Sequence, residues 1–312
     1  MTPFAFVFPG QGSQAVGMLD AWGDHAAVRQ TLAEASEVLG EDIGQLIHAG
    51  PKEQLDLTTN TQPVMLTAGI ACYRAWIAET GLVPSVVAGH SLGEYSALVA
   101  AGSLTLAAAL PLVRFRAQAM QDAVPGGAGA MAAILGLDAQ AVRDGCAEVS
   151  AATGEVVDAA NFNDPKQTVI AGSKAGVDKA CELLKAKGAK RALLLSVSAP
   201  FHSSLMKPAA ERLRERLAAT TLVAPLTPVV NNIDVKTESD PAAIREALYR
   251  QAFGPVRWVE VVQAIRARGV SHIVECGPGK VLAGIVRRID SEAAAGALVD
   301  PASLAELKGL LA

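Results

Sequence analysis

A serine between two glycines follows a short apolar run and precedes a segment with helical character. The motif is Gly89-His90-Ser91-Leu92-Gly93, with residues 85–88 before it and residues 94–99 after it. A strand, a sharp turn and a helix in this order form a nucleophile elbow, which exposes the serine hydroxyl. The glycines allow the strand and the helix to pack closely. A glycine-flanked serine also occurs in ordinary turns, so the flanking segments carry the prediction that Ser91 is a nucleophile.

Short apolar runs alternate with helical patterns in the first part of the chain. Residues 4–8 form an apolar run that ends at Pro9 and Gly10, and residues 26–39 and 63–77 have helical spacing. Strands that alternate with helices predict a parallel α/β sheet.

A glycine-rich run at residues 125–129 marks a change in composition and a candidate domain crossing. The segments after it alternate in a different order: strand 131–137, helix 138–149, strands 156–161 and 168–172, a helix from Ser173 to Gly188 and strand 189–197. This βαββαβ order is ferredoxin-like.

After Pro200 the pattern predicts helices at 206–217, 258–268 and 280–288, and extended segments at 228–232 and 271–275. We therefore predict a large α/β domain made of residues 1–126 and 199–312, with a small ferredoxin-like domain, residues 127–198, inserted into it.

The composition indicates which kinds of partner and which cellular location to expect. The chain has 312 residues, 51% of them hydrophobic, and a formal net charge of -4, which leaves no basic field for nucleic acid. Its cysteines form no CxxC pair, which argues against a zinc site and a disulfide framework. The sequence has no export signal and no apolar run typical of a membrane span. We expect a cytoplasmic protein without metal or cofactor, and neither nucleic acid nor a membrane as partner.

The first glycine loop permits a second interpretation. Gly10, Gly12 and Ala15 formally match the loose dinucleotide fingerprint. The residues that follow lack a second strand ending in an acidic ribose partner, which disfavours a nicotinamide enzyme.

The segment GHSLGEYSALVAAG resembles the active-serine segment of malonyl-CoA:acyl carrier protein transacylases. FVFPGQGSQ, APFH near position 200, VNN around Asn231 and ECGPGKVL are similar to other signatures of that family and extend the match over nearly the whole chain. The resemblance implies an α/β-hydrolase-like large domain and a ferredoxin-like small one. It also implies a malonyltransferase that moves a malonyl group from malonyl-CoA to the phosphopantetheine thiol of acyl carrier protein through a malonyl ester of serine. A chain without fused modules favours fatty acid biosynthesis over polyketide synthesis.

The same resemblance implies the groups that assist Ser91. The residues themselves do not single out His202 among five histidines, but the family's histidine motif makes it the general base. No Asp or Glu stands out as a third triad member, and the backbone carbonyl of Gln251 is implied to orient the histidine. The backbone N–H groups of Gln11 and Leu92 are implied to form the oxyanion hole.

Two further residues are implied to select the substrate. Arg114 and Arg116 flank the apolar face of a helix at residues 106–120 about equally, so the helical pattern leaves the choice open. The resemblance implies that Arg116 binds the malonyl carboxylate through its planar fork. Phe201 is implied to exclude an α-methyl group. Asn161 and Asn163 are candidates either for contact with the pantetheine arm or for surface turns.

Two other functions share these features. A serine hydrolase would use the same elbow with water as the acceptor. A carrier-binding subunit without turnover would keep the fold and form no covalent adduct.

Overall fold

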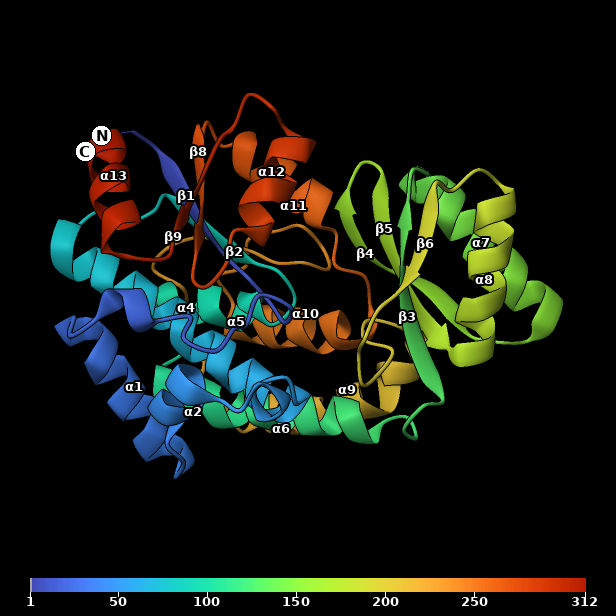
Figure 1. Ribbon diagram of the computed structural model, residues 1–312, viewed down its shortest axis with the longest axis horizontal. Coiled ribbons are helices and arrows are strands. Elements are labelled where there is room, and N and C mark those ends of the chain that lie inside the picture. Colours follow the sequence, from blue (N-terminus) through green and yellow to red (C-terminus); the bar gives the residue numbers. More distant parts are fainter. Residues whose placement is uncertain (1) are drawn as a thin grey trace.

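Two sheets organise the protein in the computed structural model, which describes residues 2–312 (Figure 1). The larger sheet has five parallel strands in the order β7-β2-β1-β8-β9, and the smaller has four antiparallel strands in the order β4-β5-β3-β6. The small sheet is formed by a continuous segment between two parts of the large core. The predicted α/β class, with a small unit inserted into a large one, is confirmed.

The strands of the large sheet are short, and all of them except the edge strand β9 are largely buried. They are β1 (Phe4–Phe8), β2 (Val86–Gly89), β7 (Val229–Val230), β8 (His272–Cys276) and β9 (Ala294–Leu298). In the register of the central pair, Phe8 lies opposite Gly89. Because the carboxyl ends of parallel strands meet at one edge, the loop after Pro9 and the turn at Ser91 lie side by side.

Helices pack around the large sheet in Figure 1. They are α1 (Ala26–Leu39), α2 (Ile43–Ala49), α3 (Lys52–Leu55), α4 (Thr58–Thr80), α5 (Gly93–Ala100), α6 (Leu106–Asp122), α9 (Lys207–Ala218), α10 (Pro241–Phe253), α11 (Trp258–Arg266), α12 (Val281–Ile289) and α13 (Pro301–Leu311). The prediction for α1 is confirmed at both ends. The prediction for α4 was too short at both ends. It missed the start of the helix because the first turn consists of the polar residues 58–62 and carries no apolar period.

The small unit has the ferredoxin-like order that the sequence predicts. Its elements are β3 (Gly129–Leu135), α7 (Ala139–Thr153), β4 (Val157–Asp164), β5 (Gln167–Ser173), α8 (Lys174–Ala186) and β6 (Arg191–Leu194). β3 ends before its predicted end, because Gly136 has a φ of 97° and leaves the strand. The domain boundaries at residues 126 and 199 stay a prediction.

Backbone hydrogen bonds join the small unit to the large core beside the elbow. The N–H of Phe162 in β4 donates to the carbonyl of Val256 at 2.9 Å, and the N–H of Val256 donates to the carbonyl of Ala160 at 2.9 Å. These bonds hold the edge of the small sheet beside the carboxyl ends of the large sheet's strands. Within residues 2–312, we find no helix with the length and apolar character of a transmembrane segment.

Candidate active site

Ser91 occupies the sharp turn between β2 and α5. Its φ is 52°, in the left-handed region that side chains other than glycine rarely adopt. A Cβ on Gly89 would lie 1.9 Å from the carbonyl of Gly93, and a Cβ on Gly93 would lie 2.1 Å from the carbonyl oxygen of Phe8. Both positions therefore require glycine for the strand, turn and helix to approach this closely.

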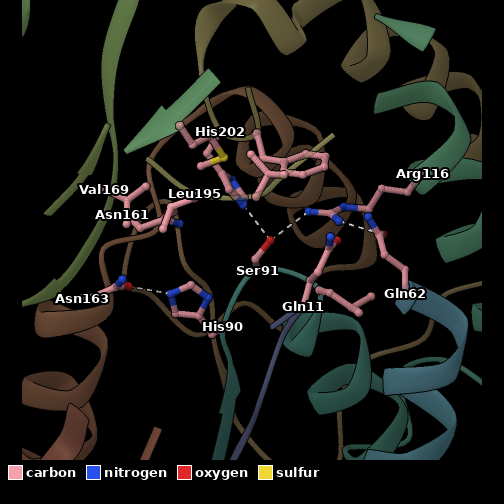
Figure 2. Close-up of a pocket in the computed structure, with 14 residues that line it drawn as sticks. Gln11, Gln62, His90, Ser91, Arg116, Asn161, Asn163, Val169, Leu195 and His202 are labelled. Carbon is pink, nitrogen blue, oxygen red and sulfur yellow. Dashed lines mark hydrogen bonds between the residues drawn. The ribbon is translucent and has the colours of Figure 1, made fainter. Parts of the chain in front are cut away.

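His202 lies at hydrogen-bond distance from this serine. Its Nε2 is 2.6 Å from Ser91 Oγ (Figure 2). Its Nδ1 is 2.9 Å from the carbonyl oxygen of Gln251 and 3.2 Å from that of Gly254. A carbonyl oxygen only accepts, so Nδ1 carries the proton of the neutral ring. Nε2 is then free to accept the proton of the serine hydroxyl.

The surroundings of His202 favour its neutral form. The side chain is only 4% exposed, and burial, with the positive charge of Arg116 as the next cause, lowers its pKa to about 3. A base whose pKa lies this low is unprotonated at neutral pH.

Arg116 reaches the same serine from α6 (Figure 2). It is 2% exposed. Its Nη1 donates to Gln62 Oε1 at 2.9 Å, and its Nη2 donates to Gln251 Oε1 at 3.1 Å and to Ser91 Oγ at 3.2 Å. Each of these acceptors is neutral. Because no carboxylate is bonded directly to the Arg116 guanidinium, its positive charge can attract an anionic ligand.

Arg114 occupies a different position on α6. Its Nη2 donates to Glu41 Oε2 at 2.9 Å, and its Nη1 donates to the other oxygen of that carboxylate. This paired arginine does not line the cavity around Ser91. The alternative that the helical pattern left open is therefore decided by position: Arg116 faces the serine and Arg114 does not.

Gln11 and Leu92 both line the cavity around Ser91. Leu92 precedes the first turn of α5, so its N–H points out of the helix start. In the part of the chain that the structure describes, the backbone N–H groups of Gln11 and Leu92 have no hydrogen-bond partner. The side chain of Gln11 points elsewhere, with Nε2 donating to Thr58 Oγ1 at 3.2 Å.

The cavity has a volume of about 200 Å³ and lies between the two sheets. Phe201 forms part of its wall beside His202, and the small unit contributes apolar side chains and Asn161. Asn163 also lines it, but its Oδ1 lies 2.8 Å from His90 Nε2. The His90 ring therefore points toward Asn163 and away from Ser91, as Figure 2 shows.

Three buried polar residues support the site and were not singled out by the sequence. Asn232 accepts from the N–H of Ser91 at 2.7 Å and donates to the carbonyl of Gly89 at 2.7 Å, which fixes the elbow. Glu94 accepts from the N–H of Asn232 at 2.8 Å. Gln62 holds Arg116 from α4. Asn232 and Glu94 lie in the VNN and GHSLGE segments, so those motifs carried the signal although they did not indicate the roles.

The fold and the site together define a serine enzyme of the nucleophile-elbow class. Residues 5–311 match the model of the acyl transferase domain family, and the chain belongs to that family. A relative from Salmonella typhimurium is 53% identical over 305 residues, covering 97% of this chain and 98% of its own; it is named malonyl CoA-acyl carrier protein transacylase. The protein is therefore an acyltransferase.

Solved structures agree over the whole length. The acyl-carrier-protein S-malonyltransferase of Burkholderia pseudomallei is 65% identical with a TM-score of 0.96, covering 99% of this chain and 100% of that one. A complex of a type II PKS acyl-carrier protein with its malonyl-transacylase includes a chain that is 49% identical, with a TM-score of 0.97 and coverage of 99% and 100%. These matches bear out the predicted family and the predicted α/β-hydrolase-like core.

Proposed function

We propose that this protein transfers a malonyl group from malonyl-CoA to the phosphopantetheine thiol of acyl carrier protein, through a malonyl ester of Ser91, and so supplies fatty acid biosynthesis. One observation carries the proposal. Ser91 Oγ lies 2.6 Å from His202 Nε2 and 3.2 Å from Arg116 Nη2. A nucleophile, its base and a carboxylate-binding cation thus converge on one oxygen.

In the first half of the reaction, Ser91 Oγ attacks the thioester carbonyl of malonyl-CoA while His202 Nε2 takes the hydroxyl proton. The backbone N–H groups of Gln11 and Leu92 donate to the oxyanion that forms. The carbon–sulfur bond then breaks, the sulfur of coenzyme A takes the proton from His202, and the malonyl ester remains.

In the second half, the carrier-protein thiol gives its proton to His202 and attacks the ester carbonyl. Collapse of this second intermediate breaks the bond to Ser91 Oγ, which recovers its proton from His202. The carbonyl of Gln251 keeps the ring in the required tautomer through both halves.

Substrate selection rests on Arg116 and Phe201. The guanidinium of Arg116 binds the free carboxylate of the malonyl group, with the planar fork that suits two oxygens. The ring of Phe201 occupies the space beside His202 that an α-methyl group would need.

Brief exposure to malonyl-CoA followed by peptide mass spectrometry tests the proposal. We expect a malonyl adduct on Ser91, which disappears when the phosphopantetheine form of acyl carrier protein is added and appears on that protein. Release of free malonate without transfer would instead indicate a serine hydrolase. A protein that binds the carrier but forms no adduct would be a subunit without turnover.

We also propose a cytoplasmic location. Cys72, Cys146, Cys181 and Cys276 are all buried free thiols, which suits a reducing compartment. Fractionation of cells that express the tagged chain would test this location directly.

A further inference from the structure

A buried carboxylate lies behind Ser91 and takes no part in the reaction described above. Glu94, in the first turn of α5, is 2% exposed. Its Oε2 accepts from the N–H of Asn232 at 2.8 Å and from Gln251 Nε2 at 2.9 Å. A buried carboxylate requires compensation by hydrogen bonds or by an opposite charge.

The side chain of Gln251 connects this carboxylate to the substrate-binding arginine. Its Oε1 accepts from Arg116 Nη2 at 3.1 Å, while its Nε2 donates to Glu94 Oε2 and, at 3.0 Å, to the carbonyl of Ser91. A guanidinium only donates, whereas a carboxylate and a carbonyl only accept. The amide therefore satisfies all three partners in one orientation, which defines an ordered relay from Arg116 through Gln251 to Glu94.

The separation between the two charges has a chemical consequence. A carboxylate bonded directly to Arg116 would occupy its donors and compete with a substrate carboxylate for them. A buried arginine without any counter-charge would be costly to the folded state. Placing Glu94 one side chain away supplies the opposite charge and leaves Arg116 Nη2 facing Ser91.

We propose that Glu94 is the counter-charge of Arg116 and that it weakens the arginine's attraction for the malonyl carboxylate, so that the malonyl group is held less tightly and can leave. This inference rests on the proposed malonyl transfer and adds to it a residue that acts through Gln251. Glu94 is thus a positioning residue that tunes specificity and does not touch the substrate.

The surroundings of Glu94 should couple the binding of a malonyl group to protonation of the Glu94 carboxylate. Burial raises the pKa of Glu94 to about 7, opposed by the hydrogen bonds from Gln251 and Asn232 and by the charge of Arg116, while Asp234 raises it further. Two further titratable groups lie near it: Tyr95, whose ring lies under the Arg116 guanidinium, and Glu238, across a small cavity that Glu94 also lines. A second carboxylate at Arg116 would compete for the same cation, so malonyl binding should drive a proton onto Glu94.

Binding of malonyl-CoA to the Ser91→Ala variant, with and without Glu94→Gln, tests the inference without turnover. Glutamine keeps an acceptor for Asn232 and Gln251 but removes the charge. At pH 8, where most of Glu94 is ionised because its pKa is about 7, we expect the Kd for malonyl-CoA to fall on the order of tenfold. The Kd for acetyl-CoA, which has no carboxylate, should change much less. Glu275→Gln is the matched control, because Glu275 is equally buried but bonds to the N–H of Ala283.

A double-mutant cycle separates the charge effect from a general disturbance. In an Arg116→Ala background, Glu94→Gln should leave the malonyl-CoA affinity unchanged. The inference would be overturned if Glu94→Gln left malonyl-CoA binding unchanged or weaker in the protein that retains Arg116. It would also be overturned if Glu94→Gln strengthened binding equally with and without Arg116. If the wild-type enzyme forms no malonyl adduct at all, the proposed function fails instead, so the two failures are distinguishable.

If Glu94→Gln does not fold, calorimetry on the Ser91→Ala variant alone tests the inference. Malonyl-CoA is titrated at pH 7 in two buffers of different ionisation enthalpy, with acetyl-CoA as the comparison. We expect net proton uptake with malonyl-CoA and none with acetyl-CoA. Malonyl-CoA binding without proton uptake would overturn the role of Glu94.

Discussion

The imidazole of His202 donates from Nδ1 to the backbone carbonyl of Gln251 across 2.9 Å. A neutral dipole thus orients the base, in the place where a carboxylate stands in a Ser-His-Asp triad. A carbonyl fixes the tautomer but stabilises the imidazolium less than a carboxylate does. Burial and the charge of Arg116 lower the pKa of His202, and they outweigh the hydrogen bonds to the Gln251 and Gly254 carbonyls, which raise it, so the free enzyme has a base of low pKa.

The rate at which Ser91 reacts should therefore change little as the pH falls below neutral. Because the pKa of His202 is lowered from 6.5 to about 3, the ring stays unprotonated as the pH falls from 8 to 5, and the base is lost only near pH 3. We would measure the rate at which an uncharged fluorophosphonate labels Ser91. A rate that halves near pH 6.5 would contradict the expectation.

The same assay has a control in His202→Ala. Removing a general base slows such a step by about two to four orders of magnitude. Labelling at a wild-type rate at neutral pH would mean that another group takes the serine proton.

Ser91→Ala should abolish the malonyl adduct and leave the fold intact. The hydroxyl contacts His202 and Arg116 but lies in a turn, so its loss should change the free energy of unfolding by about 1 kcal/mol or less. Mass spectrometry and urea unfolding check the two parts. An adduct that persists on another residue would exclude Ser91 as the nucleophile.

Arg116→Ala should lower malonyl transfer selectively. Removing one partner of a buried charge pair costs about 2–5 kcal/mol, which corresponds to a loss of roughly 30-fold to several thousand-fold. Acetyl transfer should be spared, because an acetyl group has no carboxylate. Arg116→Lys should recover only part of the loss, since an ammonium lacks the planar fork.

Arg114→Ala is the matched control on the same helix. Its partner is Glu41 at the surface, so both transfer rates should stay close to wild type. Loss of malonyl selectivity in Arg114→Ala, with selectivity retained in Arg116→Ala, would assign carboxylate binding to the other arginine.

Phe201→Ser should admit methylmalonyl-CoA better. The ring forms part of the cavity wall beside His202, and the space for one methyl group corresponds to a shift of about 1–3 kcal/mol in selectivity. The measurement is the ratio of methylmalonyl to malonyl transfer rates. An unchanged ratio would mean that another side chain excludes the methyl group.

Gly93→Ala should destabilise the protein. The new Cβ would lie 2.1 Å from the carbonyl oxygen of Phe8, and the backbone shift needed to relieve this clash costs about 1–3 kcal/mol. Urea unfolding measures the difference. Gly126→Ala is the control, because its Cβ would meet nothing within 4 Å, and it should change the free energy of unfolding by less than about 0.5 kcal/mol.

The sequence pattern predicted the elements whose formation depends mainly on residues close together in the chain. The apolar period placed α1 at residues 26–39 as the structure has it, and the glycines around Ser91 predicted the elbow because its geometry depends on the backbone of a few consecutive residues. The alternation after residue 129 predicted the ferredoxin-like order. β9 gave no signal, since Ala294–Leu298 is rich in alanine and glycine and becomes a strand by pairing with β8.

The grouping of the site was decided by tertiary structure. Ser91 meets residues more than a hundred positions away: His202 at its hydroxyl, Asn232 at its N–H and the Gln251 side chain at its carbonyl. Periodicity describes one helix face at a time, so it ranked Arg114 and Arg116 equally. Only the positions of α4 and α10, which bring amide oxygens to one guanidinium, distinguish the arginine beside Ser91 from the one paired with Glu41 at the surface.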